Sequence, residues 1–219
     1  MRIAVVGGHG QIARLLHPLL VAAGHRPVAL VRRAEQRVAL EAAGAEVRLL
    51  DIENDDVADF ARAFDGCDAV VFSAGGGPDG NAARKRTVDL EGSLKSAAAA
   101  SSAGIRRFVQ VSAIDVDRPV APDADPVWAA YVAAKRDADA ALRATALDWT
   151  ILRPGRLTDA PATGLIALGS DVARGDVTRA DVAAVLAAVV DRPESVHRQW
   201  NLVGGDVPVA DAIARAAAS

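Results

Sequence analysis

A tyrosine and a lysine stand four residues apart, at Tyr131 and Lys135, in an alanine-rich segment of the chain. On a helix, residues at this spacing share one face. Because an ammonium group beside a phenol stabilises the phenolate, we expect Lys135 to lower the pKa of Tyr131 from its unperturbed value of about 10. Such a tyrosine can exchange protons near neutral pH. Tyr131 is the only tyrosine, and chance pairs of this kind occur, so packing is the alternative.

A second group of residues has the spacing of a phosphate-binding turn. Gly7, Gly10 and Ala13 follow a short apolar run, and helical spacing begins at Gln11. The first glycine permits a tight turn, the second lets the backbone approach a pyrophosphate, and the alanine allows close helix packing. Free N–H groups at a helix start favour phosphates. The pattern predicts a dinucleotide at Gly7, Gly10, Gln11 and Ile12, and a turn without a ligand is the alternative.

The end of the second apolar run bears on which dinucleotide binds. Arg32 and Arg33 stand where an NAD-preferring site usually has an acid for the ribose 2′-hydroxyl. Two guanidinium groups suit a 2′-phosphate, because they form paired, charge-assisted hydrogen bonds. The sequence therefore favours NADP over NAD as the cofactor. A solvated, basic helix start is the alternative interpretation.

Two further turns are expected to contact the dinucleotide. Asp51 and Ile52 follow the third apolar run, where they would meet the adenine edge as a hydrogen-bond acceptor and an apolar wall. Ala74 and Gly75 follow the fourth run, and small residues there would let the dinucleotide pass close over the sheet edge. An exposed loop acid and a merely flexible loop are the respective alternatives.

The elements that must position these residues alternate along the chain. Short β-branched runs separate longer segments with helical spacing, which predicts a Rossmann-type, doubly wound α/β fold with a mostly parallel sheet and helices on both faces. The expected strands are 2–6, 26–31, 46–50, 69–73, 107–111, 148–153 and a late one near 199–203. The expected helices are 11–23, 34–42, 87–103, 127–145 and 179–190. We expect one domain over 1–219, with a substrate pocket formed by loops 75–80, 115–126 and 154–169.

Taken together, these motifs resemble the atypical short-chain dehydrogenases/reductases with an NAD(P)H-binding domain, which are related to extended, epimerase-like members. The resemblance covers nearly the whole chain and is carried by segments 6–13, 108–113, 131–135, 152–155 and 178–183. It implies that Lys135 also holds the nicotinamide ribose and that Ser112 hydrogen-bonds the substrate oxygen. It further implies that Pro154 passes beside the nicotinamide, and that Tyr131 protonates a carbonyl oxygen while hydride arrives from the cofactor.

The resemblance favours an NADP(H)-dependent oxidoreductase acting on a small carbonyl or alcohol substrate. One alternative is a non-catalytic regulatory protein that senses NADPH, and the intact Tyr131 and Lys135 favour the enzyme. Another is an NAD-dependent epimerase or dehydratase, although the chain after Arg153 leaves little room for a separate substrate lobe. The basic run Arg84-Lys85-Arg86 is expected either to be solvated at the start of a helix or to bind the substrate. Trp128 is expected either to pack in the core or on the surface, or to form a wall of the substrate pocket.

Composition limits the remaining possibilities. The net charge is −3 and aromatic residues are 4%, which disfavours a nucleic-acid partner. No apolar run has the length of a signal peptide core or a membrane span, so we expect a cytoplasmic protein without a membrane partner. One cysteine, Cys67, excludes an internal disulfide, and the four histidines lack metal-ligand spacing, so no metal is expected. A monomer or a homodimer fits equally well.

Overall fold

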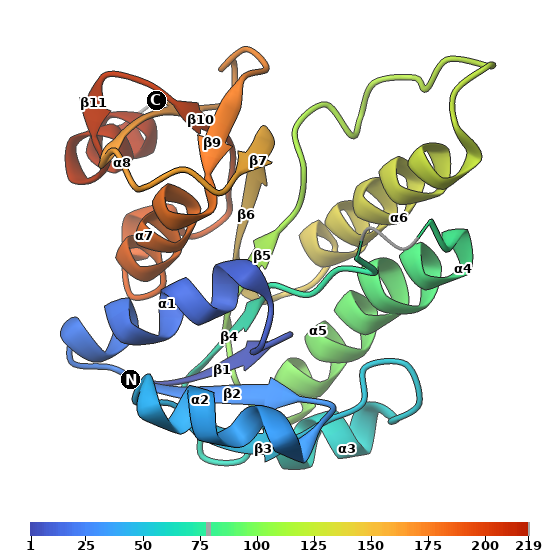
Figure 1. Ribbon diagram of the computed structural model, residues 1–219, viewed down its shortest axis with the longest axis vertical. Coiled ribbons are helices and arrows are strands. Elements are labelled where there is room, and N and C mark those ends of the chain that lie inside the picture. Colours follow the sequence, from blue (N-terminus) through green and yellow to red (C-terminus); the bar gives the residue numbers. More distant parts are fainter. Residues whose placement is uncertain (78–79, 219) are drawn as a thin grey trace.

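A nine-stranded sheet lies at the centre of the fold in the computed structural model, which describes residues 1–77 and 80–218 (Figure 1). Its strands are β1 (Arg2–Val6), β2 (Arg26–Val31), β3 (Glu46–Leu49), β4 (Ala69–Phe72), β5 (Arg107–Val111), β6 (Asp148–Pro154), β8 (Leu165–Gly169), β10 (Arg198–Gly204) and β11 (Val207–Pro208). They lie in the order β11-β8-β10-β6-β5-β4-β1-β2-β3. The strands from β10 to β3 are parallel, whereas β8 pairs antiparallel with both β10 and β11.

The strand order places a crevice beside β1. The chain builds outward from β1 to β3 and then returns to form β4 on the other side of β1. At such a switch point the loops after the two strands diverge, and a ligand crevice opens at their carboxyl ends. The glycine turn follows β1 and residues 73–77 follow β4, so both predicted cofactor loops lie at this crevice.

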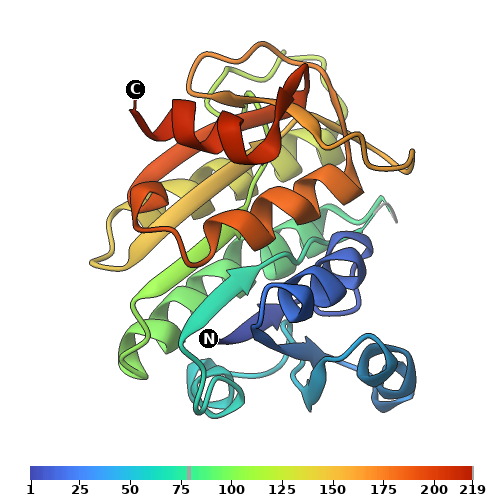
Figure 2. The same cartoon turned by 90° about the vertical axis from the view of Figure 1, so that its left-hand side faces the viewer.

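Helices cover both faces of the sheet because successive strand residues point to opposite sides. Ile3 and Val5 of β1 pack into one apolar cluster, and Ala4 and Val6 pack into another. The first face carries α1 (Gln11–Ala22), η1 (Ala34–Gln36) with α2 (Arg37–Ala42), α7 (Arg179–Val189) and α8 (Val209–Ala218) (Figure 2). The opposite face carries α3 (Val57–Ala63), α4 (Ala82–Arg84), the π-helix η2 (Lys85–Glu91), α5 (Gly92–Ser102) and α6 (Pro126–Arg143).

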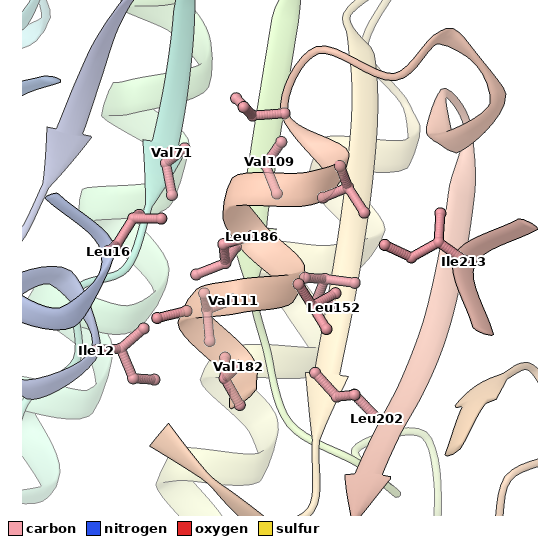
Figure 3. Close-up of a cluster of buried hydrophobic side chains, with 14 of the residues drawn as sticks. Ile12, Leu16, Val71, Val109, Val111, Leu152, Val182, Leu186, Leu202 and Ile213 are labelled. Atoms are coloured by element: carbon pink, nitrogen blue, oxygen red, sulfur yellow. The ribbon is translucent and has the colours of Figure 1, made fainter. Parts of the chain in front are cut away.

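The packing of α1 against α7 fixes the position of the glycine turn. Figure 3 shows Ile12 and Leu16 of α1 facing Val182 and Leu186 of α7 above the sheet. All four side chains are buried, and burying one such side chain contributes about 1.5–3 kcal/mol. The start of α1 is therefore held rigidly over the carboxyl end of β1.

The predicted fold class is confirmed, but several segments differ from expectation. Segment 154–169 was expected to be a loop, but it contains the strand β7 (Arg156–Thr158), and its last five residues form β8. β7 pairs with β9 (Asp176–Thr178) in a separate two-stranded sheet. The expected helix 87–103 starts within the π-helix η2, and α3, α8 and η3 (Pro193–Ser195) were not predicted. Within the described ranges, no helix combines the length and apolar character needed to span a membrane.

Candidate functional site

The glycine turn after β1 has the geometry that a bound phosphate requires. Gly7 has a φ of +78°, and a Cβ there would lie 2.8 Å from the Cα of Ala74, so only glycine fits. The Gly10 N–H closes the turn on the Gly7 carbonyl at 2.8 Å. Helix α1 begins directly afterwards without a side-chain cap. Its first backbone N–H groups therefore face the crevice as free donors, where a phosphate would be favoured.

A cleft of about 270 Å³ opens beside this turn. Seven of the residues predicted to bind the cofactor line it: Gly7, Gly10, Arg32, Asp51, Ile52, Ala74 and Gly75. Ser73 also lines the cleft, and its hydroxyl oxygen is buried without a hydrogen-bond partner in the described part of the chain. A buried, unpaired hydroxyl carries a desolvation cost that a polar ligand would relieve. The cleft therefore fits the phosphate and adenosine parts of a dinucleotide.

Of the two arginines predicted to bind the cofactor, only Arg32 lines the cleft. Arg32 lines the cleft and lies 3.5 Å from Glu53, whereas Arg33 is exposed and does not line it. Glu53 also accepts from Thr87 at 2.9 Å and lies 3.3 Å from the Arg84 guanidinium. Three further residues of the cleft wall were not predicted: Glu53, Arg84 and Val88. They come from the loop after β3, from α4 and from η2, and no local sequence pattern shows that these segments approach β2.

Asp51 lines the cleft, but its carboxylate is occupied by its own turn. It accepts from the backbone N–H groups of Glu53 and Asn54 and from the Asn54 side-chain amide. Partial burial opposes ionisation, yet these hydrogen bonds and Arg32 hold the pKa of Asp51 below its ordinary value. Asp51 is thus an ionised carboxylate that fixes the shape of its own turn at the cleft wall, and its contact with an adenine remains a prediction.

Four other predicted cofactor residues lie outside this cleft. Gln11 is exposed and lines a separate cleft of about 420 Å³, together with residues 158–161 and Arg179. Ile12 is 8% exposed and packs in the core. Pro154 ends β6 and accepts the Ile114 N–H at 3.0 Å. Lys135 is buried behind the crevice, so a direct cofactor role for any of these four remains a prediction.

The predicted Tyr131 and Lys135 do share one face of α6. The ammonium of Lys135 lies 6.0 Å from the centre of the Tyr131 ring. It donates to the Val111 carbonyl at 3.1 Å and to the Ala74 carbonyl at 3.4 Å. These two carbonyls follow β4 and end β5, so α6 places the pair at the carboxyl edge of the sheet, beside the glycine turn.

A buried carboxylate changes the electrostatics expected for this pair. Asp89, on the π-helix η2, lies 3.1 Å from the Lys135 ammonium and accepts the Gly76 N–H at 2.8 Å. Both charges are almost fully buried. Burial alone would lower the pKa of Lys135, but the Asp89 carboxylate raises it above its ordinary value. Lys135 is therefore charged, with its charge balanced by Asp89.

The pKa of Tyr131 is raised, not lowered as its spacing from Lys135 had predicted. Burial of the phenol is the largest effect and raises the pKa above its ordinary value. Lys135 acts in the opposite direction, but Asp89 and Asp139 offset it. Tyr131 is a neutral phenol at neutral pH. It therefore holds the proton that a donor role needs, and the Lys135 ammonium stabilises the phenolate that donation would leave.

Ser112 is engaged in a buried network instead of facing the crevice. Its hydroxyl donates to Asp139 at 2.7 Å, and Asp139 also accepts from Gln110 and from Arg153. Arg153 reaches onward to Asp117 at 2.5 Å and so anchors the loop after β5. The proton that Ser112 would offer a substrate oxygen is already donated to Asp139. A substrate contact therefore requires its hydroxyl to rotate, and that role remains a prediction.

Two glycine-rich corners shape the rest of the crevice. At the end of β6, a Cβ on Gly155 would lie 2.0 Å from the Gly175 carbonyl oxygen, so this close approach requires glycine. In the loop after β4, the Gly76 N–H and the Gly77 carbonyl are both held by side chains of η2. Pro78 and Asp79 of the predicted pocket loop 75–80, like Ser219, lie outside the described residues.

His17 holds the glycine turn through a hydrogen bond, and its burial predicts how the stability of the protein depends on pH. Its ring is fully buried, and Nε2 donates to the Gly8 carbonyl at 2.7 Å. Burial lowers the pKa of His17 below its ordinary value of 6.5. Because the unfolded chain then takes up a proton that the folded chain refuses, the free energy of unfolding should fall as pH drops below about 6.5, by at most ~1.4 kcal/mol per pH unit.

Denaturant unfolding between about pH 7.5 and about pH 5 measures this slope. The His17→Gln variant serves as the control, because it keeps a side-chain amide donor but does not titrate. The variant should lose part of the acid sensitivity. An identical slope in both proteins would assign the acid sensitivity to other groups.

Comparison with known proteins identifies the family. Residues 7–193 match the NAD(P)H-binding family, which is most of the chain. The chain belongs to this family. A Bacillus subtilis (strain 168) protein named as an uncharacterized sugar epimerase, YhfK, is 37% identical over 97% of this chain and 99% of its own length.

Two solved structures support the same assignment. A Bacillus halodurans protein, provisionally named an NAD-dependent epimerase/dehydratase, has a TM-score of 0.90 and 36% identity over 98% of this chain and 99% of that chain. The oxidoreductase ylbE from Lactococcus lactis has a TM-score of 0.86 and 27% identity over 98% of this chain and 96% of that chain. The Rossmann-type fold and NAD(P)H-binding membership expected from the sequence are confirmed.

Proposed function

We propose that this protein is an NADP(H)-dependent oxidoreductase that reduces a small carbonyl compound. The observation that carries the proposal is the position of Tyr131 and Lys135. Through the Ala74 and Val111 carbonyls, Lys135 ties its face of α6 to the ends of β4 and β5. This arrangement holds the protonated phenol of Tyr131 beside Lys135, at the carboxyl edge of the sheet where the cofactor loops also lie.

The residues of the chain divide the chemistry among them. When bound, the reduced dinucleotide supplies the hydride. The phenol of Tyr131 donates its proton to the carbonyl oxygen of the substrate, and the burial that keeps it protonated suits that direction. Asp89 balances the charge of Lys135 and accepts the Gly76 N–H. It thereby fixes the loop after β4 relative to α6, which carries Tyr131. The reacting groups are thus pre-positioned, which lowers the entropic cost of reaction.

Arg32 supports the choice of NADP and predicts a cofactor preference. Its guanidinium lines the cleft at the end of β2, where NAD-specific sites carry an acid. The unmodified protein should bind NADPH more tightly than NADH. Arg32→Ala should weaken NADPH binding by ~10-fold or more and leave NADH binding nearly unchanged, because only NADPH carries the 2′-phosphate.

Titration calorimetry with both cofactors measures this preference. Arg33→Ala is the matched control, since Arg33 is exposed and does not line the cleft, and it should change neither affinity by more than about twofold. Equal affinities for NADPH and NADH in the unmodified protein would contradict the NADP assignment.

The names of the Bacillus relatives favour a second candidate, an epimerase that uses NAD transiently. A panel of aldehydes and ketones separates the candidates through the consumption of NADPH. A reductase oxidises one equivalent of NADPH for each carbonyl reduced. An epimerase interconverts sugar stereoisomers without net oxidation of the cofactor. Binding of NADPH with neither reaction would favour the sensor interpretation and would contradict an enzymatic role.

A further inference from the structure

One cation beside Tyr131, Lys85, forms no ion pair with any residue that the structure describes. Lys85, the first residue of η2, is only 7% exposed, so it is not the solvated residue that a basic run suggests. Its ammonium donates to the Gly77 carbonyl, and no carboxylate of residues 1–77 or 80–218 pairs with it. Burying an ammonium without a counter-ion is costly. This cost is a reason to expect a ligand that supplies the missing charge.

The other charges of this region distinguish Lys85 from its neighbours. Glu53 lies 3.3 Å from Arg84, Glu91 lies 2.9 Å from the exposed Arg86, and Asp89 balances Lys135. Arg84 lines the cofactor cleft, whereas Lys85 does not. Its ammonium instead lies 6.0 Å from the centre of the Tyr131 ring. Lys85 therefore points its charge toward the proton donor and away from the adenosine end.

An aromatic pair extends this region to a second cation, Arg174. Trp128, which is 43% exposed, lies 5.5 Å from Tyr131 between ring centres. The guanidinium carbon of Arg174, from the exposed loop between β8 and β9, lies 6.0 Å from the centre of the indole ring. No ion pair forms on Arg174 within the described ranges. Lys85 and Arg174 therefore place a positive charge beside each ring of the Trp128–Tyr131 pair.

We propose that the substrate is an anionic carbonyl compound whose carboxylate or phosphate group is bound by Lys85. An ammonium has three hydrogen-bond donors, and the Gly77 carbonyl uses one of them, which leaves donors for an oxyanion. Arg174, held over Trp128, adds to the attraction for an anion beside the aromatic pair. The inference rests on the proposed function in taking the space beside Tyr131 as the substrate site.

Binding of three probes to the protein saturated with NADP⁺ tests the inference without requiring turnover. The probes are benzoate, phenyl phosphate and benzamide, and calorimetry gives their affinities. At least one of the two anions should bind ~10-fold or more tightly than neutral benzamide, because a charge-assisted hydrogen bond is stronger than a neutral one. The tighter of the two anions distinguishes a carboxylate site from a phosphate site.

Variants assign the preference to a residue. Lys85→Met keeps most of the side-chain volume and should abolish the preference for the anion. Arg174→Gln, on an exposed loop, should reduce it by a smaller factor, which keeps the test valid if Lys85→Met folds poorly. Arg86→Gln, which removes a neighbouring exposed charge, should leave the preference unchanged.

The outcomes separate this inference from the proposed function. Equal binding of anions and benzamide, or an anion preference that survives in Lys85→Met, would overturn the anion site while leaving a reductase possible for neutral carbonyl compounds. An anion preference that depends on Lys85, with no turnover in the carbonyl panel, would support the anion site and contradict the reductase.

Discussion

Replacing Gly10 with valine is expected to abolish dinucleotide binding in a protein that still folds. Gly10 has an extended backbone that any residue can adopt, and a Cβ there would lie 3.1 Å from the Gly7 carbonyl oxygen and 3.7 Å from the Ser73 carbonyl oxygen. The added side chain therefore projects from the turn toward the place where the pyrophosphate should lie. Affinity for NADPH and NADH alike should fall by roughly 100-fold or more.

Calorimetry measures the loss, and thermal unfolding checks the fold of the variant. Gly10→Ala provides a graded control, because a single methyl group should weaken binding less than valine does. Gly7 is unsuitable for this test, since any side chain there clashes with Ala74 and has a strained φ. If Gly10→Val folds and keeps its affinity, the phosphates do not cross this turn.

The second large effect concerns the proton donor. Tyr131→Phe removes one hydroxyl, keeps the ring against Trp128 and should leave NADPH affinity nearly unchanged. Turnover of an accepted carbonyl substrate should fall by roughly 10²–10⁴-fold, as is usual when a general acid is lost. Unchanged turnover would make Tyr131 a packing residue.

The pH profile gives an independent check on the same residue. A proton donor is active below its pKa, and burial raises the pKa of Tyr131 above its ordinary value of 10. Carbonyl reduction should therefore not decline through loss of this proton between about pH 7 and about pH 10. Lys135→Met is a poor substitute for Tyr131→Phe, because it leaves the buried Asp89 carboxylate unpaired and destabilises the fold.

Local sequence patterns were sufficient to predict the framework of this protein. The β1 turn, the arginine after β2 and the spacing of Tyr131 and Lys135 each depend on neighbouring residues. Their expected elements recur with nearly the same bounds. Seven predicted cofactor residues converge on one cleft, because the carboxyl ends of parallel strands meet at one edge.

Interactions between distant segments could not be predicted in this way. The pairing of Asp89 with Lys135 depends on the π-helix η2, whose wider turn is not encoded by any simple period. Burial of the phenol, with smaller contributions from Asp89 and Asp139, outweighs the effect that Lys135 has on the pKa of Tyr131. Glu53 reaches Arg32 only after β2 and β3 are aligned side by side. In both cases, residues far apart in the sequence set the charge at the site.

A crystal structure of the protein with NADP⁺ tests the central claim most directly. We expect the pyrophosphate on the backbone N–H groups after Gly10 and the 2′-phosphate against Arg32. The nicotinamide should lie within reach of the Tyr131 hydroxyl, across a space that a carbonyl group can fill. A dinucleotide bound away from the glycine turn, or a nicotinamide separated from Tyr131 by the packed core, would contradict it.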